Sequence, residues 1–329
     1  MITRKVAPAL AAGCAVVLKP AEQTPLSALA LAELAERAGV PAGVLNVVTT
    51  NDPAAAGAEF TSNPLVREIA CAGSTEVGRI LMRQSADQVK KISFELGGNA
   101  PLIVFDDADL EAAVEGAIAS KYRNAGVQTC VCANRIYVQD AIYDALREEV
   151  RRSRRSLQGR SRHRTRGGDR PAHRRAGARR KVEEHVADAL RQGRARARRR
   201  SAPRARGSFL RAHGACRSDP RNAPCARRRT FGPVAPLFRF RTEEEAVRMA
   251  NAAEFGLAAY FFARRRRAPS FASPRRSKPG SFSVNTGIFS QEVAPFGGVK
   301  QSGIGREGSK YGIEPFLEIK FVCLGGIQP

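Results

Sequence analysis

Residues 91–122, KISFELGGNAPLIVFDDADLEAAVEGAIASKY, decide the fold. They contain two short β-type runs, Lys91 to Phe94 and Pro101 to Phe105, and then a helical pattern that starts at Asp109. Four apolar residues of that helix recur at every fourth position and share one face: Leu110, Val114, Ile118 and Tyr122. Strands that alternate with an amphipathic helix predict an α/β fold in which helices pack on a parallel sheet.

The same alternation extends back to the N-terminus. β-type runs at residues 15–18, 45–48 and 68–71 alternate with helical patterns over residues 24–39 and 75–86. In the first of these helices we expect Thr24 as the N-cap, Pro25 as the first helical residue and Gly39 just past the end. The first 18 residues superficially resemble a signal peptide, but no cleavage region follows and the apolar run is too short to cross a bilayer.

Length and cysteine content restrict the class of protein. A chain of 329 residues suggests about two domains at roughly 150 residues each, which excludes a peptide hormone or a disulfide-stapled small fold. Seven cysteines without ladder-like spacing indicate a reducing compartment. We therefore expect a cytoplasmic protein without a membrane segment.

The net charge of +24 is concentrated in two places. Residues 151–229 hold 27 Arg and one Lys against five acidic residues, and residues 264–280 add six Arg and one Lys. In residues 151–180 and 194–229, only Leu157, Phe209 and Leu210 represent Leu, Ile, Val and Phe, so we expect these segments to be disordered or poorly packed. Between them, residues 181–193 have the pattern of an amphipathic helix.

Two explanations of the Arg-rich segments remain open. Arg, Ala, Pro, Gly and Ser are the residues that GC-rich codons give when read out of register, and we hypothesise that residues 151–180, 194–229 and 264–280 are translated in a shifted frame. Alternatively, they form a genuine disordered basic region that binds nucleic acid nonspecifically through its charge. Aromatic residues for base stacking are nearly absent there, since Phe209 is the only one between 151 and 229. Sequencing of the coding DNA distinguishes the two.

Four segments can carry chemistry. Cys130 lies in a Gly-containing turn after the helix, where a thiolate can attack a carbonyl carbon, although most cysteines are small buried apolar residues. Glu95 ends a strand before two glycines and is either a general base or a structural acid. Gly73 and Ser74 lie between a strand and a helix, where helix amides bind phosphate. Residues 295–307 form a Gly-dense loop whose simplest role is structural.

Together these segments resemble the aldehyde dehydrogenase superfamily, and most closely the succinate-semialdehyde dehydrogenases. The resemblance rests on the order and spacing of ELGGNAP (95–101), the turn from Asn124 through Gln128-Thr129-Cys130, Phe231-Gly232-Pro233, and PFGGVKQSG (295–303). It covers residues 1–150, 181–193, 230–263 and 280–329. It implies a partial Rossmann-like cofactor domain over 1–97, an α/β catalytic domain over 98–300, and a segment over 301–329 that returns to the cofactor domain and supplies an oligomerisation strand.

The resemblance implies NAD(P)-dependent oxidation of succinic semialdehyde to succinate, a step of γ-aminobutyrate degradation. Cys130 would form a thiohemiacetal with the aldehyde, hydride would pass to the nicotinamide, and Glu95 would activate the water that hydrolyses the thioester. This division of roles suits a thiolate and a carboxylate base.

The same resemblance assigns the binding residues. Lys19 and Glu22 match positions that hold the adenosine ribose, and Gly73, Ser74 and Phe231 match other cofactor contacts. A carboxylate at Glu22 would repel a 2′-phosphate, which favours NAD over NADP. No metal is implied.

On the substrate side, Arg123 and Ser290 match residues that bind the distal carboxylate. A guanidinium suits a carboxylate, although Arg123 is alternatively a cation that stabilises a helix C-terminus. Cys132 resembles a redox partner of the nucleophile in some relatives, and an inert neighbour is the alternative.

The departures from the family pattern predict a weakly active or inactive chain. The family's Pro-Trp-Asn-Phe-Pro segment, which lies before the position of Met1 and supplies an oxyanion contact, is absent, so we interpret the chain as N-terminally truncated. Val127 is an extra residue in the catalytic turn, and Arg229 replaces the Glu that holds the nicotinamide ribose. Homo-oligomers are implied for the family. The alternative function is a non-catalytic remnant whose basic region contacts nucleic acid nonspecifically.

Overall fold

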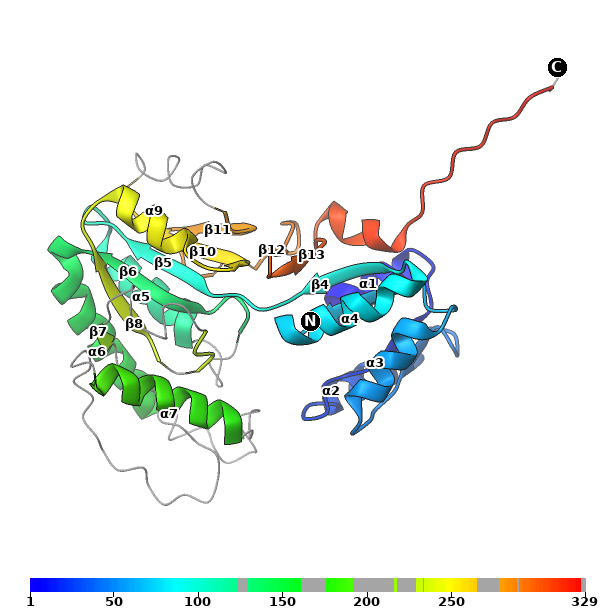
Figure 1. Cartoon of the computed structure of the whole chain (residues 1–329), viewed down its shortest axis with the longest axis horizontal. Helices are drawn as coiled ribbons and strands as arrows, with labels where there is room; N and C mark the ends of the chain where they lie inside the picture. Colours follow the sequence, from blue (N-terminus) through cyan, green and yellow to red (C-terminus); the bar gives the residue numbers. More distant parts are fainter. Residues whose placement is uncertain are drawn as a thin grey trace.

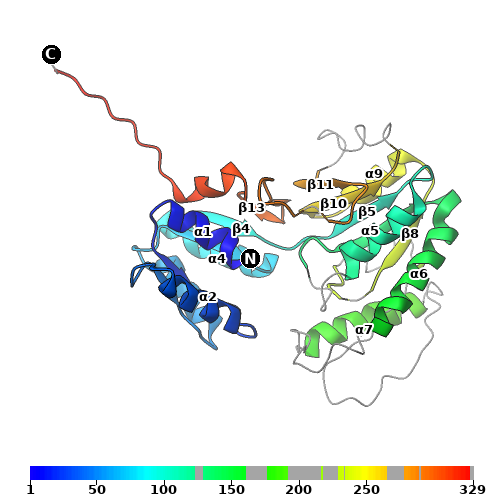
Figure 2. The same cartoon turned by 180° about the vertical axis from the view of Figure 1, so that it is seen from behind.

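The structure is a computed structural model that describes residues 1–122, 129–160, 176–191, 216–217, 229–232, 234–264, 278–288 and 290–326. Figures 1 and 2 show two bodies side by side, with β12 and β13 between them. The chain passes from the first body to the second just after Glu95, close to the predicted domain boundary at residue 97. The boundaries at 97 and 300 remain predictions.

The first body contains short parallel strands and the helices that connect them. Its elements are α1 (Ile2–Ala11), β1 (Val16–Leu18), α2 (Leu26–Arg37), β2 (Leu45–Val47), α3 (Pro53–Ser62), β3 (Glu68–Ala72), α4 (Thr75–Ser85), η1 (Ala86–Gln88) and β4 (Lys91–Glu95). Strand β1 pairs in parallel with β2, and β3 pairs in parallel with β4. The C-terminal strand β13 (Gly303–Ile304) returns to pair antiparallel with β4.

The second body is built on a six-stranded sheet with the order β11-β10-β5-β6-β8-β7, in which every pairing is parallel. Its strands are β5 (Ala100–Val104), β6 (Ala133–Gln139), β7 (Cys216–Arg217), β8 (Pro236–Phe240), β10 (Ala258–Phe262) and β11 (Ser281–Val284). Its helices are α5 (Leu110–Tyr122), η2 (Asp140–Ile142), α6 (Tyr143–Arg160), α7 (Ala176–Arg191) and α9 (Glu243–Asn251). Strands β9 (Phe255–Gly256) and β12 (Val299–Lys300) pair with each other, and η4 (Lys310–Phe316) follows β13.

The core lies on both faces of this sheet, as the predicted α/β fold requires. Along β5, Leu102 and Val104 face α5 and α6, whereas Ile103 and the following Phe105 face the opposite side, where α9 packs. Figures 1 and 2 show these helices on the two sides of the sheet. A strand buried on both faces must be apolar throughout, because successive side chains point to opposite sides. The sequence PLIVF meets this condition.

The predicted apolar face of α5 is confirmed: Val114 is buried in the core, and Leu110, Ile118 and Tyr122 pack against it. The predicted start of α2 is wrong by one position. Pro25 stands at the N-cap with helical backbone angles and α2 begins at Leu26, so Thr24 does not cap it. Gly39 lies past the helix end with a φ of +83°, as the sequence predicts.

Residues 151–180, expected to be disordered or poorly packed, are helical at both ends, so the expected disorder is wrong there. Helix α6 continues through Arg160, and α7 begins at Ala176 rather than near residue 181. Arg and Ala are good helix formers even where no apolar face exists, and ion pairs at helical spacing, such as Arg151 with Glu148 at 2.7 Å, add support. In the expected 194–229 segment, residues 216–217 form strand β7 at the sheet edge, and residues 192–215 and 218–228 lie outside the described residues. The same holds for residues 265–277 of the third Arg-rich segment.

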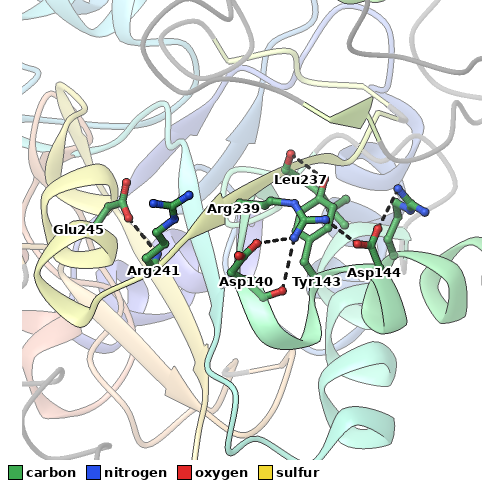
Figure 3. A network of polar contacts seen from close by, with 8 residues as sticks. Asp140, Tyr143, Asp144, Leu237, Arg239, Arg241 and Glu245 are labelled. Atoms are coloured by element: carbon green, nitrogen blue, oxygen red, sulfur yellow. Dashed lines mark hydrogen bonds and ion pairs between the residues drawn. The ribbon is translucent and has the colours of Figure 1, made fainter.

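A network of polar contacts joins β8 to the start of α6 (Figure 3). Arg239 forms ion pairs with Asp140 and Asp144, and its guanidinium carbon lies 4.0 Å from the centre of the Tyr143 ring. The Tyr143 hydroxyl donates to the Leu237 carbonyl. The network fixes the crossing of helix and strand at the end of the sheet that faces away from the first body.

Among the helices of the described residues, none is both long enough and apolar enough to cross a membrane.

Candidate active site

Three of the segments singled out in the sequence meet at one end of the β3–β4–β13 sheet. The Gly73 amide donates to the Glu95 carbonyl at 3.0 Å, and Gly303 pairs with Glu95 from the other side. The turn before α4, the end of β4 and the C-terminal Gly-dense loop therefore converge on Glu95. Parallel strands bring their carboxyl ends to the same edge, which is where ligands bind in sheets of this kind.

The Gly-dense loop holds the segment after Glu95 in place through hydrogen bonds. Ser302 is fully buried, and its hydroxyl donates to the Gly97 carbonyl at 2.6 Å and accepts from the Gly256 amide at 2.9 Å. Thr75 bonds the same region, since its hydroxyl donates to the Gln301 carbonyl and accepts from the Gly97 amide. These contacts support the structural role of the loop.

Gly98 brings the cysteine turn against the end of the first body. A Cβ at this position would lie 2.5 Å from the carbonyl oxygen of Cys130, so only glycine permits the approach. The cysteine turn of the protein itself therefore makes a close backbone approach at this glycine. As a result, Cys130 and Glu95 belong to one site although they come from different bodies.

Cys130 is half-buried and carries a free thiol. Burial raises the pKa of this thiol, and the Glu95 carboxylate raises it further, whereas the Arg229 guanidinium lowers it. The net direction is upward, so the thiol at neutral pH is mostly protonated until a base or a cation assists it.

Glu95 is a buried acid whose carboxyl oxygens are near the Gly298 backbone amide but make no hydrogen bond of normal geometry in the described part of the chain. Burial raises its pKa to about 8, with a further contribution from the neighbouring Glu307 carboxylate, while Lys5 and Arg306 oppose the shift. A carboxyl with a pKa near neutrality can accept and release a proton during a reaction.

Glu307 and Lys5 belong to the site but were not singled out as site residues from the sequence. Their side chains form an ion pair at 2.7 Å, with both groups largely buried. Glu307 stands in the Gly305-Arg306-Glu307 motif, and a buried acid in a Gly-dense loop was the available signal. Lys5 of α1 carried no signal, because it reaches Glu307 only after the C-terminal segment folds back.

Cys132 contacts the last turn of α5. Its thiol is buried and donates to the Lys121 carbonyl at 3.6 Å. The Lys121 ammonium is also buried and donates to Asn134 Oδ1 at 3.0 Å, and burial lowers its pKa. Both cysteines of the turn are free thiols, and the redox role of Cys132 remains a prediction.

The residues predicted to hold the adenosine end of a cofactor follow the carboxyl ends of two strands, Lys19 and Glu22 after β1 and Ser74 after β3. The Lys19 ammonium and the Glu22 carboxylate form an ion pair at 2.6 Å, with about a fifth of each side chain exposed. Ser74 is the N-cap of α4, where its hydroxyl accepts from the Val77 amide at 3.3 Å. A helix N-terminus at this edge is compatible with a phosphate, and the roles of Lys19, Glu22 and Ser74 remain predictions.

The remaining predicted residues are placed as follows. Ser290 is exposed, and Arg4 donates to its hydroxyl at 2.6 Å. Phe231 has a φ of +50°, and the guanidinium of Arg229 covers its ring. Arg123 and the extra Val127 lie outside the described residues.

The fold and the site define an α/β protein in which a cysteine turn packs against the glycine segment that follows a buried carboxyl. The profile of the aldehyde dehydrogenase family matches residues 1–322, and the chain belongs to this family.

Several relatives are more than half identical to this chain. It is 55% identical over 330 residues to the glutarate-semialdehyde dehydrogenase of Pseudomonas aeruginosa, covering 99% of this chain and 67% of the relative. It is 56% identical over 331 residues to the succinate-semialdehyde dehydrogenase [NADP(+)] GabD of Escherichia coli, covering 99% of this chain and 66% of the relative. The chain thus spans about two thirds of the length of these curated relatives.

A solved structure of a relative has the same fold as this chain. The succinate-semialdehyde dehydrogenase of Burkholderia pseudomallei superposes with a TM-score of 0.88 at 50% identity, covering 99% of this chain and 67% of that one.

Proposed function

We propose that this chain carries the catalytic residues for NAD(P)-dependent oxidation of a semialdehyde to a carboxylic acid. The observation that carries the proposal is the contact of the Cys130 turn with Gly98, which brings a half-buried thiol and the buried Glu95 carboxyl into one site. The names of the relatives supply the substrate class, an aldehyde with a distal carboxylate such as succinic or glutaric semialdehyde.

Cys130 acts as the nucleophile and Glu95 as the base. The sulfur forms a bond to the aldehyde carbon, and its proton leaves to a base because burial disfavours the thiolate. Once the carbon has been oxidised, Glu95 accepts a proton from the water that hydrolyses the thioester, a role for which its pKa of about 8 is suited.

Lys19, Glu22, Gly73, Ser74 and Phe231 hold the cofactor in this proposal. Bound NAD or NADP supplies the hydride acceptor. The preference for NAD rests on Glu22 alone, whereas the E. coli relative is named for NADP(+). In the structure the Glu22 charge is paired with Lys19, which weakens its repulsion of a 2′-phosphate. We therefore propose that either dinucleotide binds.

Arg123 and Ser290 bind the distal carboxylate in the proposed reaction, and Cys132 remains a candidate redox partner. Location in the cytoplasm, a place in γ-aminobutyrate degradation and assembly into homo-oligomers belong to the same proposal. Nonspecific nucleic-acid binding, the alternative function, has no support from the comparisons, and the Arg-rich segments that suggested it lie mostly outside the described residues.

An assay of the purified full chain tests the proposal. Succinic and glutaric semialdehyde are incubated with NAD or NADP, and the reduced nicotinamide is followed by its absorbance. We expect slow turnover that Cys130→Ala abolishes and Cys14→Ala does not, since the Cys14 thiol contacts the Phe316 carbonyl and has no role in the proposed chemistry. Turnover that survives Cys130→Ala contradicts the proposal.

A further inference from the structure

Arg229 is enclosed by the parts of the candidate active site. Its Nη2 donates to the carbonyl of Thr129, the residue before Cys130, at 3.2 Å. Its guanidinium carbon lies 3.7 Å from the centre of the Phe231 ring, and its Nη1 would lie 3.5 Å from a Cβ on Gly97. The side chain is thus held between the cysteine turn, an aromatic ring and the glycine segment that follows Glu95.

The charge of this side chain is not neutralised locally. Arg229 forms no ion pair with a carboxylate of the described residues, and its buried Nε has no hydrogen-bond partner among them. Burial lowers the pKa of Arg229 to about 10, so the guanidinium keeps its charge at neutral pH. The negatively ionising groups that act on it are the thiols of Cys130 and Cys132 and, more weakly, Glu76, and the buried Lys121 is a like charge that also interacts with it.

The backbone next to it is held in an unusual conformation. A φ of +50° is unfavourable for a bulky residue such as Phe231 and persists only where the surroundings hold it. Stacking of the guanidinium on the ring provides such a constraint and fixes the cation in place.

We infer that Arg229 is the charge partner of Cys130: it stabilises the thiolate and makes the sulfur react preferentially with negatively charged electrophiles. This inference rests on the proposed role of Cys130 as the nucleophile. Arg229 is then a positioning residue. It acts by stabilising the negative charge on the Cys130 sulfur and by attracting anions to the site electrostatically.

The other charged groups around the Cys130 sulfur determine whether removal of Arg229 raises or lowers the pKa of the thiol. Glu95, across the Gly98 contact, opposes the thiolate, and Arg229 favours it. The buried Lys121 ammonium interacts with Cys132 and, more weakly, with Arg229 itself. Removal of the Arg229 charge leaves Glu95 unopposed, so the thiolate must become scarcer at a given pH.

Alkylation of Cys130 in the full chain, without substrate or cofactor, tests the inference. In this reaction the thiolate electron pair forms the sulfur–carbon bond and iodide leaves. Neutral iodoacetamide and anionic iodoacetate are each reacted over a range of pH, and the modified Cys130 peptide is quantified by mass spectrometry. Arg229→Gln removes the charge, Arg229→Lys retains it, and Arg79→Gln removes an exposed charge that pairs with Glu254.

We expect Arg229→Gln to move the alkylation profile upward by about one pH unit, a roughly tenfold loss of thiolate below the midpoint. The ratio of iodoacetate to iodoacetamide rates falls by about threefold or more, because an unscreened cation no longer attracts the anion. Arg229→Lys restores much of the ratio, and Arg79→Gln leaves both readouts as in the unmodified chain. An unchanged profile and ratio in a folded Arg229→Gln protein overturns the inference.

A second measurement keeps the inference testable if Arg229→Gln fails to fold. In the unmodified chain, added salt must lower the iodoacetate preference, since salt screens the cation. A preference that does not respond to salt, or no preference at all, overturns the inference. Alkylation needs no turnover, so the two proposals fail separately. Absence of catalysis with intact anion selectivity refutes only the proposed function. Catalysis without anion selectivity refutes only the role of Arg229.

Discussion

Glu95 is an acid that the fold keeps largely from water and next to a second carboxylate. Its pKa of about 8 in the folded chain lies above the ordinary value of 4.5. The folded state therefore holds a proton that the unfolded state has lost, and this contribution to stability is fully present below about pH 4.5 and lost as the pH rises through about 8.

This difference predicts how Glu95→Gln changes the pH dependence of stability. Between about pH 5 and about pH 9 the free energy of unfolding should fall less for Glu95→Gln than for the unmodified chain, because the variant has no carboxyl to ionise. Urea titrations at both pH values measure it. Glu36→Gln, on the exposed part of α2, is the matched control and should keep the original slope. Parallel pH dependences for the unmodified chain and Glu95→Gln would falsify the burial of this acid.

Gly98 makes a second prediction at the residue scale. Alanine there places a Cβ 2.5 Å from the Cys130 carbonyl oxygen and must displace the cysteine turn. Displacement of a reacting atom by about 1 Å can cost around a hundredfold in rate, so any turnover should fall by about that factor.

Alkylation of Cys130 gives a readout for Gly98→Ala even without turnover, since its rate should change as well. Gly57→Ala is the control. Gly57 lies inside helix α3, and a Cβ there would make only an ordinary 3.4 Å contact with Leu81 of α4. We expect this control to be neutral or to gain about 0.5–1 kcal/mol of stability. Equal reactivity in the Gly98 variant and the control would show that the turn does not depend on the close approach.

At the scale of elements, Arg239 connects β8 with α6 (Figure 3). Arg239→Met should lower the free energy of unfolding by about 1 kcal/mol, since the variant loses two partly exposed ion pairs and the contact with the Tyr143 ring. Thermal melts at low and high salt measure it, and the difference should shrink in high salt.

Arg241→Met is the matched control for that prediction. Arg241 directly follows β8. It contacts Glu245 through its backbone amide, at 2.8 Å, and the substitution leaves this contact in place. Equal melting temperatures for the two variants would show that the Arg239 network does not hold the helix against the strand.

The elements also show what the sequence could and could not predict. Strand β5 and helix α5 were predictable, because their burial on two faces and on one face leaves a clear apolar pattern in residues 101–122. The second half of α6 was not predictable from the sequence, because residues 151–160 contain only one large apolar residue and so show no apolar pattern. Helix propensity and ion pairs such as Arg151 with Glu148 support the helix instead.

In the site, Cys130 and Glu95 were identified because each stands in a Gly-containing segment with recognisable spacing. The meeting of Lys5, Glu307 and Glu95 could not be foreseen, since it depends on the antiparallel pairing of β13 with β4 and no local pattern encodes it. The stacking of Arg229 on Phe231 likewise depends on a backbone angle that favours glycine.

At the scale of the whole molecule, Ser302 joins the two bodies. Its fully buried hydroxyl bonds Gly97, at the end of the first body, and Gly256, next to the second sheet. Ser302→Ala leaves two buried backbone groups without partners, which should cost about 1–3 kcal/mol.

Urea unfolding and limited proteolysis of the Ser302 variant check this expectation. The cleavage rate should rise in residues 295–307, which the hydroxyl anchors, whereas Ser27→Ala, on the exposed surface of α2, should leave both measurements unchanged. Identical unfolding curves for the two variants would show that the loop is held without this side chain.

The order of the large sheet has a consequence for synthesis of the chain. Strand β5 lies between β6 and β10, and β10 is encoded far later in the sequence than β5. Roughly 150 residues separate the two strands, which at about 5–20 residues per second leaves one edge of β5 unpaired for about 8 to 30 seconds on the ribosome. An apolar strand with an open edge is a template for pairing between nascent chains. The yield of soluble protein should therefore depend on chaperones that bind the nascent chain during this interval.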